Sequence, residues 1–179
     1  SSRFGADHRW GMFWSLGFMW NIKNEAFLKD IEWLTSAQVK LSTGTSGNSE
    51  IPYYDHLALV SGDANYNDEA GIYPSQSGNE ELSWEQTWAN NVGVSFGLYN
   101  RVNVNVDFYH KKTTNMLMLV PQSYAITGVG NRWDNIGAMM NRGVEIAIDG
   151  DVIRTKDFTW NLSANVSYNK NKLLELYNG

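Results

Sequence analysis

The sequence predicts an all-β fold: an antiparallel segment of about six consecutive strands from a larger transmembrane β-barrel. Three observations predict it. Apolar and polar residues alternate over stretches of about ten residues, short and long connections take turns along the chain, and aromatic residues gather near the ends of the stretches. Several stretches are about twice as long as the usual strand of a soluble protein. Such long strands, with short turns on one side and long loops on the other, are typical of membrane barrels.

Six alternating stretches predict the strands. In chain order they cover residues 10–20, 36–43, 84–98, 101–111, 139–149 and 158–169. The fourth is the clearest, because Val102, Val104 and Val106 alternate with Asn103 and Asn105. Since successive side chains of a strand point to opposite faces, each stretch has one apolar and one polar row.

The connections between these stretches differ strongly in length. Residues 99–100 and 150–157 form short returns, whereas residues 44–83 and 114–137 form long loops. Apolar residues at helical spacing within 21–35 predict a brief helical turn on the short side. Short and long connections therefore fall at opposite ends of the predicted sheet.

Aromatic residues mark both ends of the predicted strands. Those near the short returns are Trp20, Tyr99, Phe158 and Trp160, and those near the long loops are Trp10, Trp84, Trp88, Tyr109 and Tyr168. Two aromatic belts are expected of a membrane barrel. A soluble β-sandwich that binds carbohydrate is the alternative, because packed sheets also give alternating strands. Six strands are too few to close a membrane barrel, so we expect a segment of a larger wall.

Composition excludes several classes of function. The 179 residues carry 14 basic and 19 acidic side chains, a net charge of -5, which argues against a nucleic-acid partner. The absence of cysteine removes disulfide scaffolds, zinc-thiolate sites and thiol nucleophiles. The chain contains no apolar run long enough for a membrane helix.

Short sequence motifs, spread over essentially the whole chain, also indicate a family resemblance. They include Arg3-Phe4-Gly5, Arg9-Trp10-Gly11, Trp20-Asn21-Ile22, Glu25-Ala26-Phe27-Leu28, Leu41-Ser42-Thr43-Gly44, Leu82-Ser83-Trp84-Glu85, Asp107-Phe108-Tyr109-His110-Lys111, Asn135-Ile136-Gly137, Asn141-Arg142-Gly143-Val144-Glu145 and Lys156-Asp157-Phe158-Thr159-Trp160. In this order, they resemble the late barrel of SusC/RagA-type TonB-dependent transporters.

This resemblance implies a 22-stranded barrel in the outer membrane of a Gram-negative cell, to which residues 1–179 contribute wall strands. It also implies an amino-terminal plug, absent from this chain, through which TonB supplies energy for import of glycans or peptides. Family members work with a SusD-like surface lipoprotein. By the family's topology, loops 44–83 and 114–137 are extracellular, and the short returns are periplasmic.

Aromatic residues of the two long loops are the candidate contacts for ligand or lipoprotein: Tyr53, Tyr54, Tyr66, Tyr73, Tyr124 and Trp133. Flat rings with amide neighbours suit stacking against sugars or peptides. For any single ring, however, packing within its own loop or contact with the lipoprotein is the favoured explanation, because loops often bury their own aromatic residues. We expect no catalytic, cofactor or metal residues and no enzyme activity. The segment 63–69 has alternating oxygen ligands, but Asp68 and Pro74 stand where a calcium loop needs glycine and glutamate.

Overall fold

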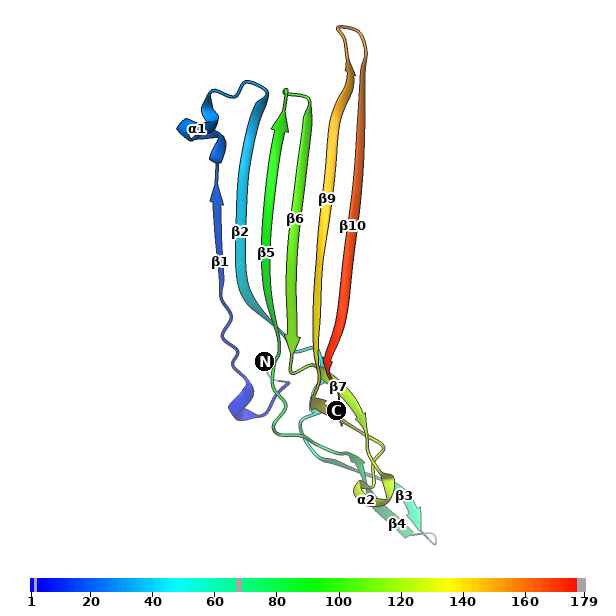
Figure 1. The fold of residues 1–179 in the computed structure, drawn as a ribbon. Coiled ribbons are helices and arrows are strands. Elements are labelled where there is room, and N and C mark those ends of the chain that lie inside the picture. Colours follow the sequence, from blue (N-terminus) through cyan, green and yellow to red (C-terminus); the bar gives the residue numbers. More distant parts are fainter. Residues whose placement is uncertain (2, 67–68, 177–179) are drawn as a thin grey trace.

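Six long strands form the main body of the protein. The computed structural model describes residues 1, 3–66 and 69–176. The strands are β1 (Ser15–Trp20), β2 (Leu34–Asn48), β5 (Glu85–Leu98), β6 (Val102–Thr114), β9 (Ala138–Arg154) and β10 (Thr159–Glu175). They pair antiparallel in the order β1-β2-β5-β6-β9-β10, as Figure 1 shows. The predicted antiparallel sheet of six consecutive strands is confirmed.

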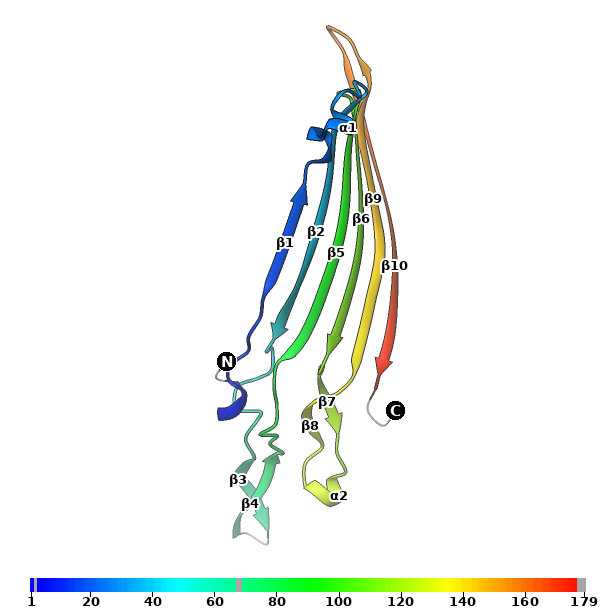
Figure 2. The same ribbon diagram turned by 60° about the vertical axis from the view of Figure 1, so that its left-hand side comes forward.

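The remaining elements lie at the two ends of this sheet. The long connections hold the hairpins β3 (Leu59–Tyr66)–β4 (Glu69–Gln76) and β7 (Leu117–Pro121)–β8 (Asn131–Asn135), with α2 (Tyr124–Thr127) between β7 and β8. Both hairpins extend from one end of the sheet (Figure 2). The short helices are η1 (Ala6–His8), η2 (Ile22–Asn24) and α1 (Ala26–Lys29), of which the last two form the expected helical turn. No helix in the described part of the chain is sufficiently long and apolar to cross a membrane.

Strand register aligns the apolar residues across the whole sheet. One row of directly opposed residues is Trp20, Val39, Val94, Val106, Ile146 and Val166. The next row on the same face, toward the long connections, is Phe18, Leu41, Val92, Phe108, Val144 and Tyr168. We call this side of the sheet the apolar face.

The opposite side, the polar face, carries the intervening residues. Its central row is Met19, Lys40, Gly93, Asp107, Glu145 and Ser167. Figures 1 and 2 show a single curved sheet, and no described segment lies over its apolar face, where Val166 is 69% exposed. A sandwich would cover these residues with a second layer. The β-sandwich alternative is therefore wrong for this fold.

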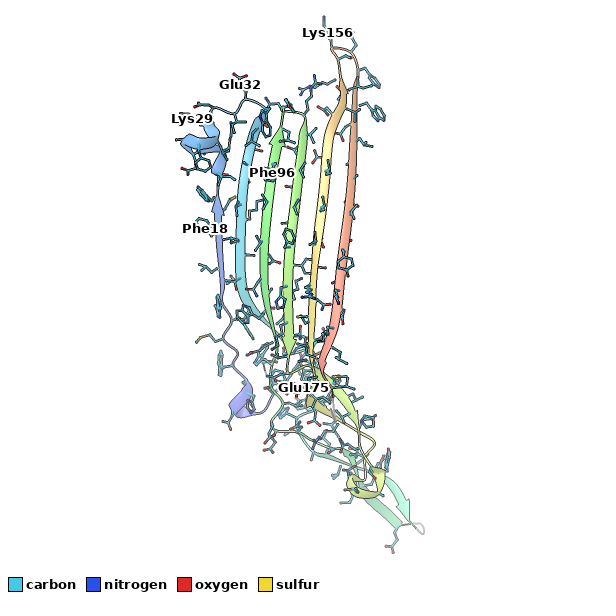
Figure 3. All side chains as sticks on the ribbon, viewed as in Figure 1. Phe18, Lys29, Glu32, Phe96, Lys156 and Glu175 are labelled. Carbon is cyan, nitrogen blue, oxygen red and sulfur yellow. The ribbon has the colours of Figure 1, made fainter. Side chains whose placement is uncertain are left out.

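A small hydrophobic core lies among the connections rather than in the sheet. Phe4, Ile51 and Leu82 are almost completely buried there, and Figure 3 shows side chains crowding together at this end. Trp84 packs edge-to-face against Phe4 and Phe13, with ring centroids 5.5 Å apart in both pairs. Trp84 thus belongs to this loop core, and its predicted place in an aromatic belt is wrong.

The first strand begins later than the sequence predicts. Residues 10–20 alternate in the sequence, but β1 begins only at Ser15. The physical reason is that the Phe13 ring turns toward Trp84, against which it packs, and this breaks the alternation.

One asparagine ties the two long connections together. The Asn135 side chain accepts a hydrogen bond from the Ser83 backbone N–H (2.7 Å) and donates to the carbonyls of Ser83 (2.8 Å) and Asn115 (3.0 Å). Close by, the Asn79 side chain donates to the Trp133 carbonyl at 3.1 Å. Since Ser83 and Asn135 belong to different connections, these bonds hold the two loops side by side.

Tyr109 lies on the polar face, and its predicted place in an aromatic belt is therefore wrong. It stands opposite Gly143 in the β6–β9 pair, and a Cβ added at Gly143 would lie 2.5 Å from the Tyr109 hydroxyl. Glycine leaves the space that the tyrosine ring fills.

We predict that Gly143→Ala destabilises the barrel by about 1–3 kcal/mol, because the added methyl group collides with Tyr109 and neighbouring backbone. Gly17→Ala is the matched control, since a Cβ there would meet no described atom within 4 Å. The measurement is the urea dependence of unfolding in the larger barrel that we expect to contain this chain. Equal losses for the two variants would contradict the packing assigned to Tyr109.

We predict that Asn135→Leu costs about 2 kcal/mol of loop stability, because its hydrogen bonds to Ser83 and Asn115 disappear and the Ser83 backbone groups stay partly buried. Limited proteolysis should then cut the two long connections faster while the sheet stays resistant. Asn131→Leu, at an exposed position four residues earlier, should leave the cleavage rate unchanged. Unchanged cleavage of the Asn135 variant would show that the loops are held by other contacts.

Candidate functional site

A hollow of about 450 Å³ opens between the two long connections. The connection from β2 to β5, which holds the β3–β4 hairpin, contributes Asp55, Tyr73 and Gln76 to its wall. The connection from β6 to β9, which holds the β7–β8 hairpin, contributes Tyr124 and Trp133. We call these the β3–β4 connection and the β7–β8 connection. We call this hollow the loop pocket. The loop pocket forms because the two connections lie side by side, held together by the hydrogen bonds of the Asn135 side chain.

The loop pocket brings together three of the six predicted contact residues. Tyr73, Tyr124 and Trp133 line it, and the Tyr124 ring is 72% exposed. Tyr53 lies elsewhere, beneath the Arg3 guanidinium at 4.8 Å from the ring centroid. Tyr54 is exposed and does not line the pocket.

Two predicted features lie partly outside the described residues. The backbone of Tyr66 ends β3, but its side chain lies outside the described residues. The segment 63–69 includes Asn67 and Asp68, which also lie outside them. Within the ranges that the structure describes, no three His, Asp or Glu side chains gather as a metal cluster.

Backbone geometry lets the β7–β8 connection close over the pocket. Gly128 ends α2 with φ 73°, a left-handed conformation that glycine adopts without steric cost. A Cβ at Gly128 would also lie 3.3 Å from the Pro74 side chain. At Gly130 an added Cβ would lie 2.8 Å from the Tyr124 ring. The two glycines therefore permit the close approach that places Tyr124 at the rim.

Charged groups give the loop pocket a polar side. Burial raises the pKa of the Asp55 carboxyl, an effect opposed by a hydrogen bond from Trp133 and by the nearby His56. Arg132 also lines the pocket, and Asp134 holds its guanidinium through hydrogen bonds of 2.8 and 3.2 Å. A carboxyl group, a fixed cation and exposed rings suit noncovalent binding of sugars or peptides.

The pocket residues Asp55, Gln76 and Arg132 escaped the sequence analysis. They come from different connections and form no local pattern. A search for polar residues close to the predicted aromatic residues would have found them, because Asp55 follows Tyr54 and Arg132 precedes Trp133.

A second hollow, of about 610 Å³, lies on the polar face of the sheet. Asp107, Tyr109, Lys111 and Glu145 line it together with several asparagines. The Lys111 ammonium lies 5.8 Å from the Tyr109 ring centroid, a cation–π contact. This face is polar along the middle of the strands, as the interior wall of a wide, wet barrel would be.

Comparison with known proteins identifies the architecture. The family model for the "TonB dependent receptor-like, beta-barrel" domain matches residues 1–178. The chain is 39% identical over 177 residues to the TonB-dependent receptor P39 of Formosa agariphila, covering 98% of this chain and 17% of that protein. It is 36% identical over 191 residues to the TonB-dependent receptor SusC of Bacteroides thetaiotaomicron, covering 100% of this chain and 19% of that protein.

Solved structures agree with these relatives. The structure of the RagAB peptide importer in the "closed-closed" state superposes with a TM-score of 0.91 at 39% identity, covering 99% of this chain and 20% of that one. The chain thus spans about a fifth of the length of the proteins it matches. The resemblance to SusC/RagA-type transporters is confirmed, and the chain belongs to the TonB-dependent receptor β-barrel family.

Proposed function

We propose that this chain forms part of the wall and outer loops of a TonB-energised importer of glycans or peptides in the outer membrane. The importer works with a SusD-like surface lipoprotein and carries out no catalysis. Family membership supports import, and the similarity to the RagAB peptide importer supports peptides as one substrate class. In this proposal TonB acts through an amino-terminal plug of the importer.

The observation that carries the proposal is the uninterrupted apolar face. Its central row runs through all six strands, and many of its side chains stay exposed, including Phe18 (58%), Leu162 (56%) and Val166 (69%). An exposed apolar surface of this extent needs an apolar partner. Lipid hydrocarbon is that partner in a membrane barrel, where outward positions are apolar and inward positions polar.

The edge of the apolar face toward the short returns is inclined to the strands, and this inclination is a second observation that supports a membrane setting. Toward the short returns, the last apolar-face residues within the strands are Trp20 on β1 and Trp160 on β10. Trp20 shares its row with Val166, which lies six residues, or three rows, from Trp160. Three rows correspond to about 20 Å along the strands, and five strand spacings to about 24 Å across them. The boundary therefore slants by about 40°, the strand tilt of membrane barrels.

This tilt also explains the unequal strand ends in Figure 1. The β9–β10 hairpin reaches beyond the other short returns, and Lys156 lies at its tip in Figure 3. A membrane surface inclined to the strands meets each hairpin at a different residue. Under the proposed topology, all short returns then leave the membrane at a similar depth on the periplasmic side.

The loop pocket is the proposed point of contact for substrate or lipoprotein. It lies at the end of the sheet that the topology makes extracellular, and its rings and polar groups suit glycan or peptide surfaces. The ties between the loops through Asn135 keep the pocket formed before a ligand arrives, which lowers the entropic cost of binding.

We predict that Val104→Arg, on the apolar face, destabilises the membrane-folded full-length protein by about 2–4 kcal/mol, because a guanidinium would face hydrocarbon. The neighbouring polar-face variant Asn105→Arg should cost little. The measurement is reversible unfolding of the full-length protein from lipid bilayers. Equal penalties at the two positions would refute the assignment of the apolar face to lipid.

We predict that Tyr124→Ala raises the half-saturating substrate concentration for import about 3-fold to 10-fold, the loss expected for one stacking ring. Ile126→Ala is the matched control, because Ile126 is 84% exposed on the same helix but does not line the pocket. Uptake of labelled oligosaccharides and labelled peptides by cells carrying the full-length protein measures the effect. Unchanged uptake with Tyr124→Ala would remove the loop pocket from the import route.

A further inference from the structure

Basic residues gather on the apolar face, just beyond its apolar rows and toward the long connections. The basic belt consists of His110, Lys112, Arg142, Lys170 and Lys172. The belt crosses three adjacent strands, β6, β9 and β10. All five residues are exposed.

Register places these side chains directly against one another. His110 stands opposite Arg142 in the β6–β9 pair, and Arg142 stands opposite Lys170 in the β9–β10 pair. The Arg142 and Lys170 side chains start from Cβ atoms about 5 Å apart, and like charges at such positions destabilise a sheet. Lys112 and Lys172 both stand opposite Met140, one row further on. The positive charges of the basic belt repel one another, so an anion bound among them would stabilise the sheet.

The protein does not itself supply this anion from the neighbouring strand positions. Asp107 and Glu145 stand opposite each other on the polar face, across the sheet from the belt. The ion pairs in the described part of the chain, Arg132–Asp134 and Asp151–Arg154, include no belt residue. Glu175 follows a register irregularity at the loop end of β10, beyond the belt (Figure 3).

An apolar hollow adjoins the cations. Its volume is about 460 Å³, and its lining combines Phe108, Val144 and Tyr168 with the basic residues His110, Arg142 and Lys170. The three apolar residues form the last apolar row before the belt. Hydrocarbon chains fit against such a floor, and a negatively charged head group fits at its cationic end.

We propose that the basic belt binds the phosphate group of a phosphorylated lipid in the outer leaflet, whose acyl chains lie on Phe108, Val144 and Tyr168. This rests on the proposed function, which puts the apolar face in lipid and the long connections outside the cell. The belt then lies at the depth of the outer-leaflet head groups. A free phosphate ion would satisfy the cations but not the apolar floor, so the structure favours a lipid as the source of the phosphate.

Lipid binding to the purified full-length protein in detergent tests this proposal. The probes are monophosphorylated lipid A, the same lipid after removal of its phosphate, and inorganic phosphate, and native mass spectrometry counts the bound lipids. We expect the phosphorylated lipid to bind at least ten times more tightly than the dephosphorylated lipid, and inorganic phosphate to compete only weakly. Equal binding of both lipids, or full displacement by inorganic phosphate, would overturn the proposal.

Variants locate the site. The double variant Arg142→Gln/Lys170→Gln should lower retention of the phosphorylated lipid at least 10-fold, whereas Lys111→Gln, on the polar face of the same sheet, should leave it unchanged. Equal loss in both proteins, or no loss in the double variant, would place the lipid elsewhere. Should the double variant not fold, the wild-type comparison of the two lipids still decides whether the phosphate is recognised.

Failure of this proposal is distinguishable from failure of the proposed function. A protein that inserts into the outer membrane and imports substrate, yet binds both lipids equally, lacks only the phosphate site. A protein that does not fractionate with the outer membrane lacks the setting on which both proposals depend.

Discussion

The structure depends on one constraint: the registers of six antiparallel strands are mutually consistent. Because strand side chains alternate with a period of two residues, slipping any strand by one residue would move its apolar set to the polar face. Here five successive pairings carry one apolar row from Trp20 to Val166 without a slip. Within the described six-stranded sheet, irregularities lie near strand ends, such as the one between Trp160 and Asn161. The division between the apolar face and the polar face, and every site assigned to either, follows from this register.

Alternation made the sheet predictable from the sequence, because period-two patterns report directly on which face a residue occupies. Tyr109 shows that the alternation of a strand is a better guide to the face of a residue than its aromatic character or its closeness to a strand end. Its place among the odd-numbered residues of the stretch, with Asn103 and Asn105, marks the polar face, but its proximity to a strand end suggested a belt. The hairpins β3–β4 and β7–β8 escaped prediction because their residues do not alternate regularly between apolar and polar. Phe13 and Trp84 left the alternating pattern for another reason, because they pack against each other in the loop core.

The loop pocket was predictable only in part. Exposed aromatic residues in long loops are visible in a sequence, and Tyr73, Tyr124 and Trp133 do come together. Which rings would meet was not visible, because the pocket requires the β3–β4 and β7–β8 connections to lie side by side. That arrangement is fixed by single polar groups such as the Asn135 amide, which no periodicity reveals. Tyr53 is an aromatic residue of the same loop that does not reach the pocket, because its ring packs against the Arg3 guanidinium of the amino-terminal segment.

The two regions of the chain are stabilised by different means, and this difference suits an importer. The sheet buries little of its apolar face within the described chain, and under the proposed function lipid covers that face. The loops hold a separate core of Phe4, Ile51 and Leu82, which packs without help from the membrane. Loops organised in this way present a preformed surface to a ligand, so less binding energy is lost in ordering them. Because Trp84 packs in the loop core one residue before β5 begins, that core is attached directly to the sheet.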